Sequence, residues 1–376
     1  MTIPATKNIN YTFKMLYIIA IFMVIDGHLG SIDYLNLEGL MRYQNFHLSL
    51  FMFASGYFLN PKENPKLFLS KKIIKLILPL YGWNIFYGLL CHILNTNFGY
   101  SLGDSFNLYN IFIAPLTDGH QFIYNMASWF IVPLFLLQII SFYLLKPFTT
   151  QNKNLPLVAL IFFIIILSIS SIITPIAPSH HGQRDFILLF YRTIYFFPSF
   201  AFGYLYRNTL EKYDTLPTPL YLVLTLTAFI TLTTLFPNYN HVPSWLDFIF
   251  EPSLILFLIS FTAILFWLRI SKTLSFLVKQ SKTLTYISDH TFAIMMHHFI
   301  GFIILKNIFS LIFQDVNIHE LKSNIWYNYF PFGEEKSSLI IITITLVITL
   351  LIDFTNSRFC DIIKRNIKVL VAKYKH

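Results

Sequence analysis

The sequence predicts an all-α polytopic membrane protein, a bundle of about ten transmembrane helices with both termini in the cytoplasm. Three observations support this prediction: the composition, the length of the apolar runs and the distribution of positive charge. Of the 376 residues, 55% are hydrophobic and only 12% are charged, whereas an ordinary soluble domain carries roughly 25% charged residues. A water-soluble fold could not cover its surface with so few polar side chains. The composition therefore excludes a soluble enzyme, a disordered tail and a disulfide-rich secreted module.

The apolar runs predict where the helices lie. A helix that crosses a hydrocarbon core of about 30 Å needs roughly 20 mostly apolar residues. About ten segments meet this requirement, at approximately 13–30, 44–60, 73–94, 128–146, 155–174, 186–206, 219–236, 248–268, 289–312 and 338–354. Segment 97–127, which contains Asp104 and Asp118, is too polar to span and is predicted to form an outer loop. Because no stretch between spans could form a soluble domain, residues 1–376 are predicted to be a single integral-membrane domain.

Positive charge is distributed unevenly between alternate loops. If both termini are cytoplasmic, 21 of the 27 lysines and arginines fall on the cytoplasmic side, six of them in a basic tail over residues 355–376. This asymmetry is typical of membrane proteins and predicts their orientation. A nucleic-acid-binding surface would instead gather basic residues on one face, so no nucleic-acid partner is expected. The two cysteines, Cys91 and Cys360, give no disulfide framework.

Polar side chains within the first two spans are candidate functional residues, because ionisable groups are costly there. Lys14 lies at the inner end of the first span and His28 at its outer end, about 21 Å apart along a helix. The alternative for His28 is an interfacial imidazole that reaches water. In the second span, His47 and Ser55 are separated by a near-integral number of turns, so a polar stripe is expected to line a cavity. Close packing of a neighbouring helix is the alternative explanation for Ser55 and Gly56.

Further candidates lie in later spans. Arg192 lies in the sixth span, where its guanidinium must face water, a carboxylate or a ligand phosphate unless it lies at the outer interface. Trp129 opens the fourth span, and an aromatic belt at the membrane surface is the simpler explanation for it. In the ninth span, His297 and His298 point about 100° apart, so only one can face a given site. No ligand spacing supplies the three or four converging groups that zinc needs, so no metal is predicted.

Lys71, Lys72 and Lys75 form a basic cluster at the inner mouth of the third span. Membrane orientation explains this cluster without any ligand, and a site for an anionic cytoplasmic cofactor is the alternative. The sequence contains no glycine-rich phosphate loop, no GxSxG elbow and no HExxH motif.

Six segments occur in an order that matches a known family. They are Tyr17 through Gly27-His28, Phe46-His47 through Ser55-Gly56-Tyr57, Lys71-Lys72 through Trp83, Ser128-Trp129-Phe130, Phe197 through Gly203-Tyr204, and Tyr286 through His298. This set, over about residues 13–300, resembles the integral-membrane acyltransferase family 3, bacterial O-acyltransferases of surface polysaccharides. In that family a basic residue stands eleven positions before the histidine. Here Tyr17 occupies that position, and Lys14 is the candidate substitute; His297 is the alternative to His298 for the last histidine.

The resemblance implies an enzyme of the bacterial inner membrane that moves an acyl group, expected to be acetyl, from cytoplasmic acetyl-CoA to a polysaccharide hydroxyl. The expected partners are acetyl-CoA as co-substrate, a surface or lipid-linked polysaccharide acceptor, and membrane lipid. His28 would be the catalytic base or a transient acyl acceptor, with Lys14 as its catalytic partner. Lys14 or the cluster of Lys71, Lys72 and Lys75 would bind the phosphates of CoA. Binding of the acceptor would fall to His47, Ser55, Trp129, Arg192 and His298.

A polysaccharide polymerase or flippase that works without acyl transfer is the alternative function. Large outer loops with several arginines would favour a polymerase, and this chain has few such arginines, namely Arg42 and Arg184. A small-solute transporter would show inverted repeats, which are not evident in the sequence.

Overall fold

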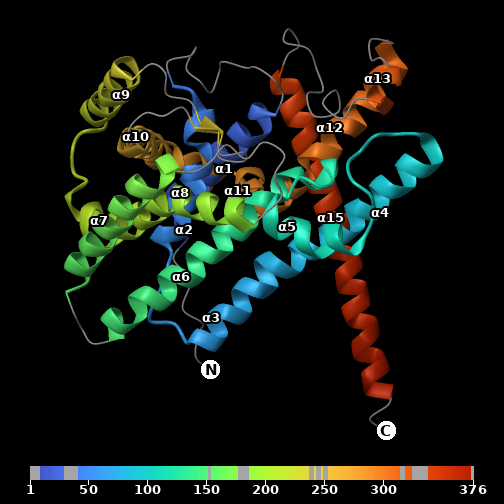
Figure 1. Ribbon diagram of the computed structural model, residues 1–376, viewed down its shortest axis with the longest axis horizontal. Helices are drawn as coiled ribbons and strands as arrows, with labels where there is room; N and C mark the ends of the chain where they lie inside the picture. The colour runs from blue at the N-terminus through green and yellow to red at the C-terminus, as the bar shows by residue number, and fades with distance from the viewer. Residues whose placement is uncertain are drawn as a thin grey trace.

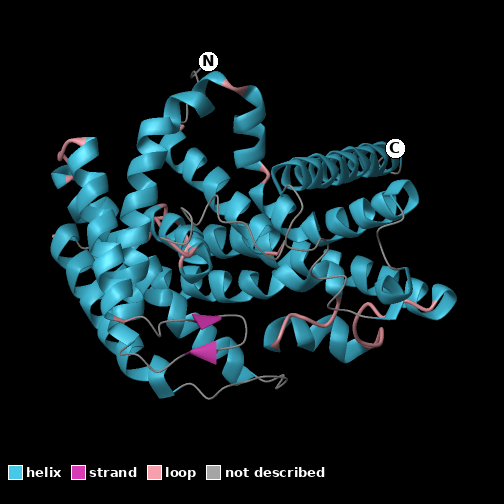
Figure 2. Cartoon of the chain, turned by 90° about the horizontal axis from the view of Figure 1, so that it is seen from above, coloured by secondary structure: helices cyan, strands magenta, loops and turns pink. Residues whose placement is uncertain are grey.

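Each predicted span contains an α-helix in the computed structural model, which describes residues 9–28, 41–150, 154–176, 186–236, 241–242, 247–248, 253–313, 318–323 and 338–373 (Figure 1). These helices are α1 (Tyr11–Gly27), α2 (His47–Tyr57), α4 (Leu78–Phe98), α6 (Ile131–Thr150), α7 (Leu155–Ile173), α8 (Phe186–Leu205), α9 (Thr218–Leu235), α10 (Ser253–Gln280), α12 (Thr291–Phe313) and α15 (Ser338–Lys373). Two short strands, β1 (His241–Val242) and β2 (Asp247–Phe248), form an antiparallel pair (Figure 2). The fold is therefore helical, as predicted.

Seven helices in the described ranges are long and apolar enough to cross a membrane. They are Pro65–Phe98, Ile123–Thr149, Leu155–Ile173, Phe186–Tyr213, Thr218–Leu235, Leu254–Gln280 and Thr291–Ile308. Helices α1 and α2 are shorter, with 17 and 11 residues, and α15 contributes the short apolar stretch Ile340–Asn356. An 11-residue helix rises only about 16 Å, about half the thickness of a hydrocarbon core. The chain is thus a multi-pass membrane protein in which two central helices are unusually short.

Local sequence signals explain where several helices begin. The side chain of Asn10 accepts a hydrogen bond from the amide of Phe13 and caps α1. Asn64 caps α3 (Pro65–Lys72) in the same way, and Pro65 occupies the first turn, where its missing N–H is not needed. A π-helical turn at Ile73–Ile77 then joins α3 to α4 as one long helix.

The basic tail that follows the last predicted span is helical. Helix α15 continues for 36 residues to Lys373 and runs out past the bundle in Figure 1. The span was predicted to end near residue 354, but lysine, arginine and leucine are good helix formers, so the change in polarity does not end the helix.

Helices α2 and α8 approach so closely that their backbones touch. A Cβ atom placed on Gly56 would lie 1.9 Å from the carbonyl oxygen of Phe200, and one on Gly203 would lie 1.9 Å from the carbonyl oxygen of Phe53. Only glycine permits such an approach. The predicted role of Gly56 in close helix packing is therefore confirmed.

The polar segment 97–127 folds against α4 instead of spanning. It contains η3 (Tyr109–Ile113) and α5 (Ala114–Thr117) and leads into η4 (Ile123–Phe130). A buried cluster of amides anchors it: the side-chain amide of Asn84 donates to the carbonyl of Ile111 at 2.7 Å, and its oxygen accepts from Gln121 and Asn125. These hydrogen bonds satisfy polar groups that burial would otherwise leave without water.

The two ends of the bundle differ in chemistry. At the end where α1 begins, the Nζ atom of Lys14 lies 2.7 Å from both carboxylate oxygens of Asp289, the last residue of α11 (Lys282–Asp289). At the other end, His28 follows the last residue of α1. We term these the lysine end, which contains Lys14 and Asp289, and the histidine end, which contains His28.

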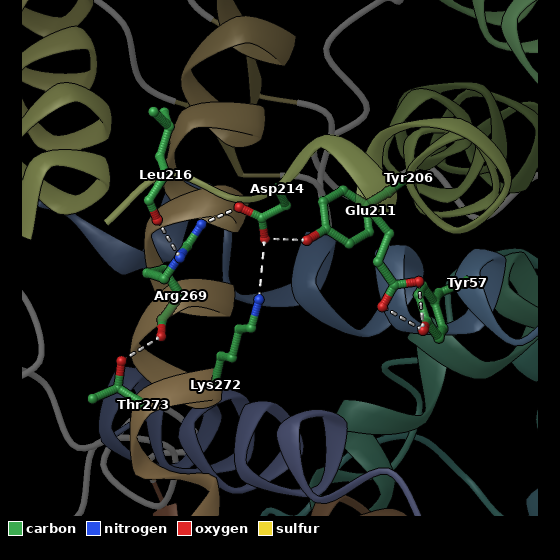
Figure 3. Close-up of polar contacts among 8 residues, drawn as sticks. All are labelled: Tyr57, Tyr206, Glu211, Asp214, Leu216, Arg269, Lys272 and Thr273. Carbon is green, nitrogen blue, oxygen red and sulfur yellow. Dashed lines mark hydrogen bonds and ion pairs between the residues drawn. The ribbon is translucent and has the colours of Figure 1, made fainter. Parts of the chain in front are cut away.

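A buried ionic network holds the helices together at the lysine end (Figure 3). The carboxylate of Asp214, in the connection between α8 and α9, pairs with Arg269 of α10 and accepts a 2.6 Å hydrogen bond from the hydroxyl of Tyr206. The hydroxyl of Tyr57, the last residue of α2, donates to Glu211 at 2.9 Å. The network therefore ties the α8–α9 connection to both α10 and α2.

Candidate functional site

Two imidazoles stack at the histidine end. The ring centroids of His28 and His298 lie 5.2 Å apart, with 24° between the ring planes, and Phe299 packs 4.8 Å from His28. His298 is fully buried, and its Nδ1 donates to the carbonyl of Met295 at 2.8 Å. Donation to a carbonyl requires the proton on Nδ1, so Nε2 is the basic nitrogen. This Nε2 has no hydrogen-bond partner among the described residues.

His47 lies near His28, and a backbone carbonyl holds its imidazole in place. Its Nδ1 donates to the carbonyl of Tyr43 at 2.8 Å. The hydroxyl of Tyr43 in turn donates to a carboxylate oxygen of Asp26 at 2.6 Å, and the Asp26 side chain is buried. Sequence reasoning did not select Asp26 or Tyr43. The available signal was a carboxylate inside an apolar helix, two residues before His28.

A fourth imidazole, His120, lies near His28 and was not predicted. Its Nδ1 lies 2.6 Å from Asp118, and both side chains are buried. Such a carboxylate holds the proton on Nδ1 and leaves Nε2 as the basic nitrogen. Gly119, between the two residues, has φ of +75°, and a Cβ there would lie 2.7 Å from the Cα of Trp129. The turn therefore needs glycine to bring His120 against Trp129.

Arg192 and Trp129 form the wall next to His120. The guanidinium of Arg192 lies 4.6 Å from the ring centroid of Trp129 and donates to the carbonyl of Asp118 at 2.9 Å. Arg192 is 1% exposed and Trp129 is 8% exposed, so Trp129 faces the protein interior and not the membrane surface. The aromatic-belt explanation for Trp129 is therefore wrong. The backbone carbonyls and the aromatic ring interact favourably with the guanidinium, and so they offset part of the cost of removing it from water.

His297 points away from His28. Its Nδ1 lies 2.6 Å from the hydroxyl of Tyr87, and the Trp83 ring packs 4.2 Å from it. The expectation that only one of the two adjacent histidines faces the site is confirmed, and the one that does so is His298.

A cavity of about 270 Å³ lies between α1, α2, α6 and α12. Most of its lining is apolar or aromatic, with Ser55, Gln138, Lys72 and Thr291 as the main polar groups. The predicted polar stripe on α2 is therefore divided between two places. Ser55 lines the cavity, whereas His47 lies at the histidine end.

The predicted basic residues have different partners. Lys72 lines the cavity, and its Nζ lies 5.1 Å from the ring centroid of Phe68. Lys71 pairs with Glu63, and Lys75 is exposed. Lys14 is held by Asp289. Lys14 and His28 lie at opposite ends of α1, as expected, and of the predicted lysines Lys72 is the one that reaches the cavity.

The cavity lies close to the stacked imidazoles, although none of the described residues that line it is a histidine. Along α6, Ile131 and Gln138 both line it, so it extends for about 10 Å parallel to that helix. Its wall at Met295 is one helical turn from His298, to which the Met295 carbonyl is hydrogen-bonded. Ile131 begins α6 directly after Trp129 and Phe130. Lys72 thus lines the cavity, whereas His298 lies one helical turn beyond its wall at Met295.

In the part of the chain that the structure describes, no three histidine, cysteine, aspartate or glutamate side chains are grouped to hold a metal ion. The donors at the histidine end are imidazoles already fixed by carbonyls or by Asp118. The arrangement provides basic nitrogens for proton transfer.

Comparison with known proteins gives one match. A family model described as an acyltransferase domain, of the acyltransferase 3 family, matches residues 11–355. This range includes every helix from α1 through α12 and the apolar part of α15. No curated protein and no solved structure is significantly similar to the chain.

Proposed function

The chain belongs to the acyltransferase 3 family, and from that membership we propose that it is a membrane-bound O-acetyltransferase. The acetyl group would pass from cytoplasmic acetyl-CoA to a hydroxyl of a cell-surface or lipid-linked polysaccharide. The observation that carries this proposal is a cavity lined by Lys72 and by Met295, whose carbonyl is hydrogen-bonded to His298 of the stacked His28–His298 pair.

The orientation follows from charge. We place the lysine end in the cytoplasm of a bacterial inner membrane, with about ten helices crossing and both termini inside, because 21 of 27 basic residues then lie inside. In this orientation Lys72 meets an anionic donor from the cytoplasm, and His28 faces the side on which a surface glycan is found.

Lys72 is the group that supports donor binding best. Lys72 lines the cavity, whereas Lys14 and Lys71 are each paired with a carboxylate. An ammonium attracts phosphate as a point charge, and the apolar walls beyond it suit the uncharged arm of a thioester. We therefore assign the phosphate contact to Lys72, with the exposed Lys75 as a second cation nearby.

His28 would act as the general base. As the acceptor hydroxyl oxygen attacks the thioester carbonyl carbon, the imidazole takes the hydroxyl proton. The carbon–sulfur bond then breaks, CoA leaves as the thiolate, and the imidazolium returns the proton to sulfur. A transient acyl-imidazole on His28 would give the same products in two steps.

The neighbouring groups would orient this base and the acceptor. Two stacked imidazoles at 5.2 Å repel each other when both are positively charged, so the His28–His298 pair carries at most one positive charge during turnover. His47 and His120, each fixed through Nδ1, present further basic nitrogens at the same end. Arg192 and Trp129 are packed against each other and would shape the wall of the acceptor site.

The test is transfer of radiolabelled acetyl from acetyl-CoA to isolated surface glycan in membranes that contain the protein. Wild-type membranes should give base-labile label, and His28→Ala should lower it at least about 100-fold with an unchanged amount of inserted protein. His92→Ala, at an exposed histidine of α4, is the matched control and should retain activity. Full activity of His28→Ala would refute the role of this residue. Absence of label together with altered glycan chain length would indicate a polymerase.

A further inference from the structure

Two polar side chains interrupt the apolar wall of the cavity. Gln138 of α6 donates from its amide nitrogen to the hydroxyl oxygen of Ser55 of α2, at 2.6 Å. Ile131, Leu134 and Gln138 all line the cavity and are spaced at one face of a helix. The Gln138 side chain therefore lines the cavity, at the opposite end of the α6 wall from Ile131.

The hydrogen bonding of this pair is incomplete. Gln138 is 7% exposed, and its Oε1 atom has no hydrogen-bond partner among the described residues. Buried amide oxygens are almost always hydrogen-bonded, because an unmade bond in an apolar surrounding is unfavourable. Exchange of the amide oxygen and nitrogen leaves an unmade donor in place of the unmade acceptor. Either arrangement is complementary to a secondary amide, which offers both an N–H and a C=O.

We propose that Gln138 and Ser55 bind an amide of a phosphopantetheine arm, with Lys72 on its phosphate. This inference rests on the proposed function, since it specifies how the acyl donor is held. Phosphopantetheine has its phosphate at one end, two secondary amides in the middle and the thioester at the other end. The cavity offers a matching set of groups: Lys72, the pair of Gln138 and Ser55, and Met295, one helical turn from His298.

This chemistry is shared by two donors, coenzyme A and the prosthetic arm of an acyl carrier protein. Neither the amide pair nor Lys72 distinguishes them, because both donors carry the same phosphate, amides and thioester. The amide contact is therefore assigned to the arm, and the donors are compared in the test.

The test measures KM and kcat with three acetyl donors: acetyl-CoA, acetyl-pantetheine, which lacks the phosphate, and the acetyl thioester of mercaptoethanol, which lacks both phosphate and amides. Gln138→Met should raise KM about tenfold for the first two donors and leave KM for the third at the wild-type value. Lys72→Met should raise KM for acetyl-CoA and not for acetyl-pantetheine. KM is also measured with acetylated carrier protein as the donor. If the enzyme uses either acetyl-CoA or the carrier protein, and Gln138→Met raises KM for that donor, the assignment is supported.

Two further variants keep the result interpretable. Ser55→Ala removes the fixed partner of Gln138 with a smaller change in volume, and it should raise KM for the same two donors. Ser141→Ala, at a fully buried serine of α6 that does not line the cavity, should change none of the values. If Gln138→Met and Ser55→Ala change KM for all three donors equally, the amide assignment is overturned. If the wild-type protein uses no thioester at all, the proposed function itself fails.

Discussion

Replacing Asp214 by alanine should destabilise the protein more than any other single change at the lysine end. The Asp214 side chain is 7% exposed and that of Arg269 is 5% exposed. Without the carboxylate, the guanidinium keeps the carbonyl of Leu216, at 3.0 Å, and the ring of Tyr221, at 3.9 Å, as its partners. The positive charge then remains buried without an anion.

Breaking a buried ion pair by removing one partner costs about 3–5 kcal/mol. Tyr206 also loses the acceptor of its 2.6 Å hydrogen bond, whereas the carbonyl and ring that remain around Arg269 reduce the penalty. We therefore expect a loss of about 3 kcal/mol in the free energy of unfolding. Asp214 also lies 3.9 Å from Lys272, but that side chain is 55% exposed, so Lys272→Met should cost less than about 1 kcal/mol.

The assay is thermal or denaturant unfolding of the detergent-solubilised protein, with Lys272→Met as the control on the same carboxylate. A double variant that replaces the pair with apolar residues, Asp214→Leu with Arg269→Met, should recover much of the stability, because it buries no uncompensated charge. Equal and small losses in Asp214→Ala and Lys272→Met would refute the reasoning. They would show that the carboxylate is hydrated in solution.

Other changes give equally direct tests. Gly56→Ala should destabilise the protein by at least about 2 kcal/mol, because the new methyl group overlaps with the carbonyl of Phe200. The control is Gly82→Ala in α4, which has open space around it and should stabilise the protein by about 0.5 kcal/mol. Similar effects of the two variants in unfolding experiments would contradict the close packing of α2. Arg192→Lys should lower the free energy of unfolding by about 1–3 kcal/mol, because an ammonium cannot reproduce the planar contacts with a carbonyl and a ring. An unchanged free energy of unfolding would mean that the wall formed by Arg192 and Trp129 is not rigid. Asp118→Asn should lower kcat about 100-fold with little change in stability, by reversing the tautomer of His120, and an unchanged kcat would remove His120 from the site.

The helices could be predicted from sequence because each apolar run has the length that a membrane requires. The boundary near residue 354 was less predictable, since the basic residues that leave the membrane continue the same helix to Lys373. The short length of α2 was also not apparent, because its polar and small residues were included in one apolar window.

Individual polar residues could be predicted, but their partners could not. His28 and His298 were each selected for being ionisable within an apolar run, yet their stacking depends on contact between helices that are far apart in the chain. Asp118 and His120 lie in a polar loop, where hydropathy gives no signal. Lys14 and Lys72 looked equivalent in sequence, and only the position of Asp289 distinguishes a paired lysine from one that lines the cavity.

The contact between α2 and α8 has a mechanical consequence. Helices separated by side chains can slide, because rotamers readjust between them, whereas helices in backbone contact at Gly56 and Gly203 have no such deformable layer. The two helices therefore move as one rigid unit, and its surface carries Phe51 and Ser55, which line the cavity. Any change in the width of the cavity must then come from motion of its other walls, such as α1, α6 or α12, relative to this unit.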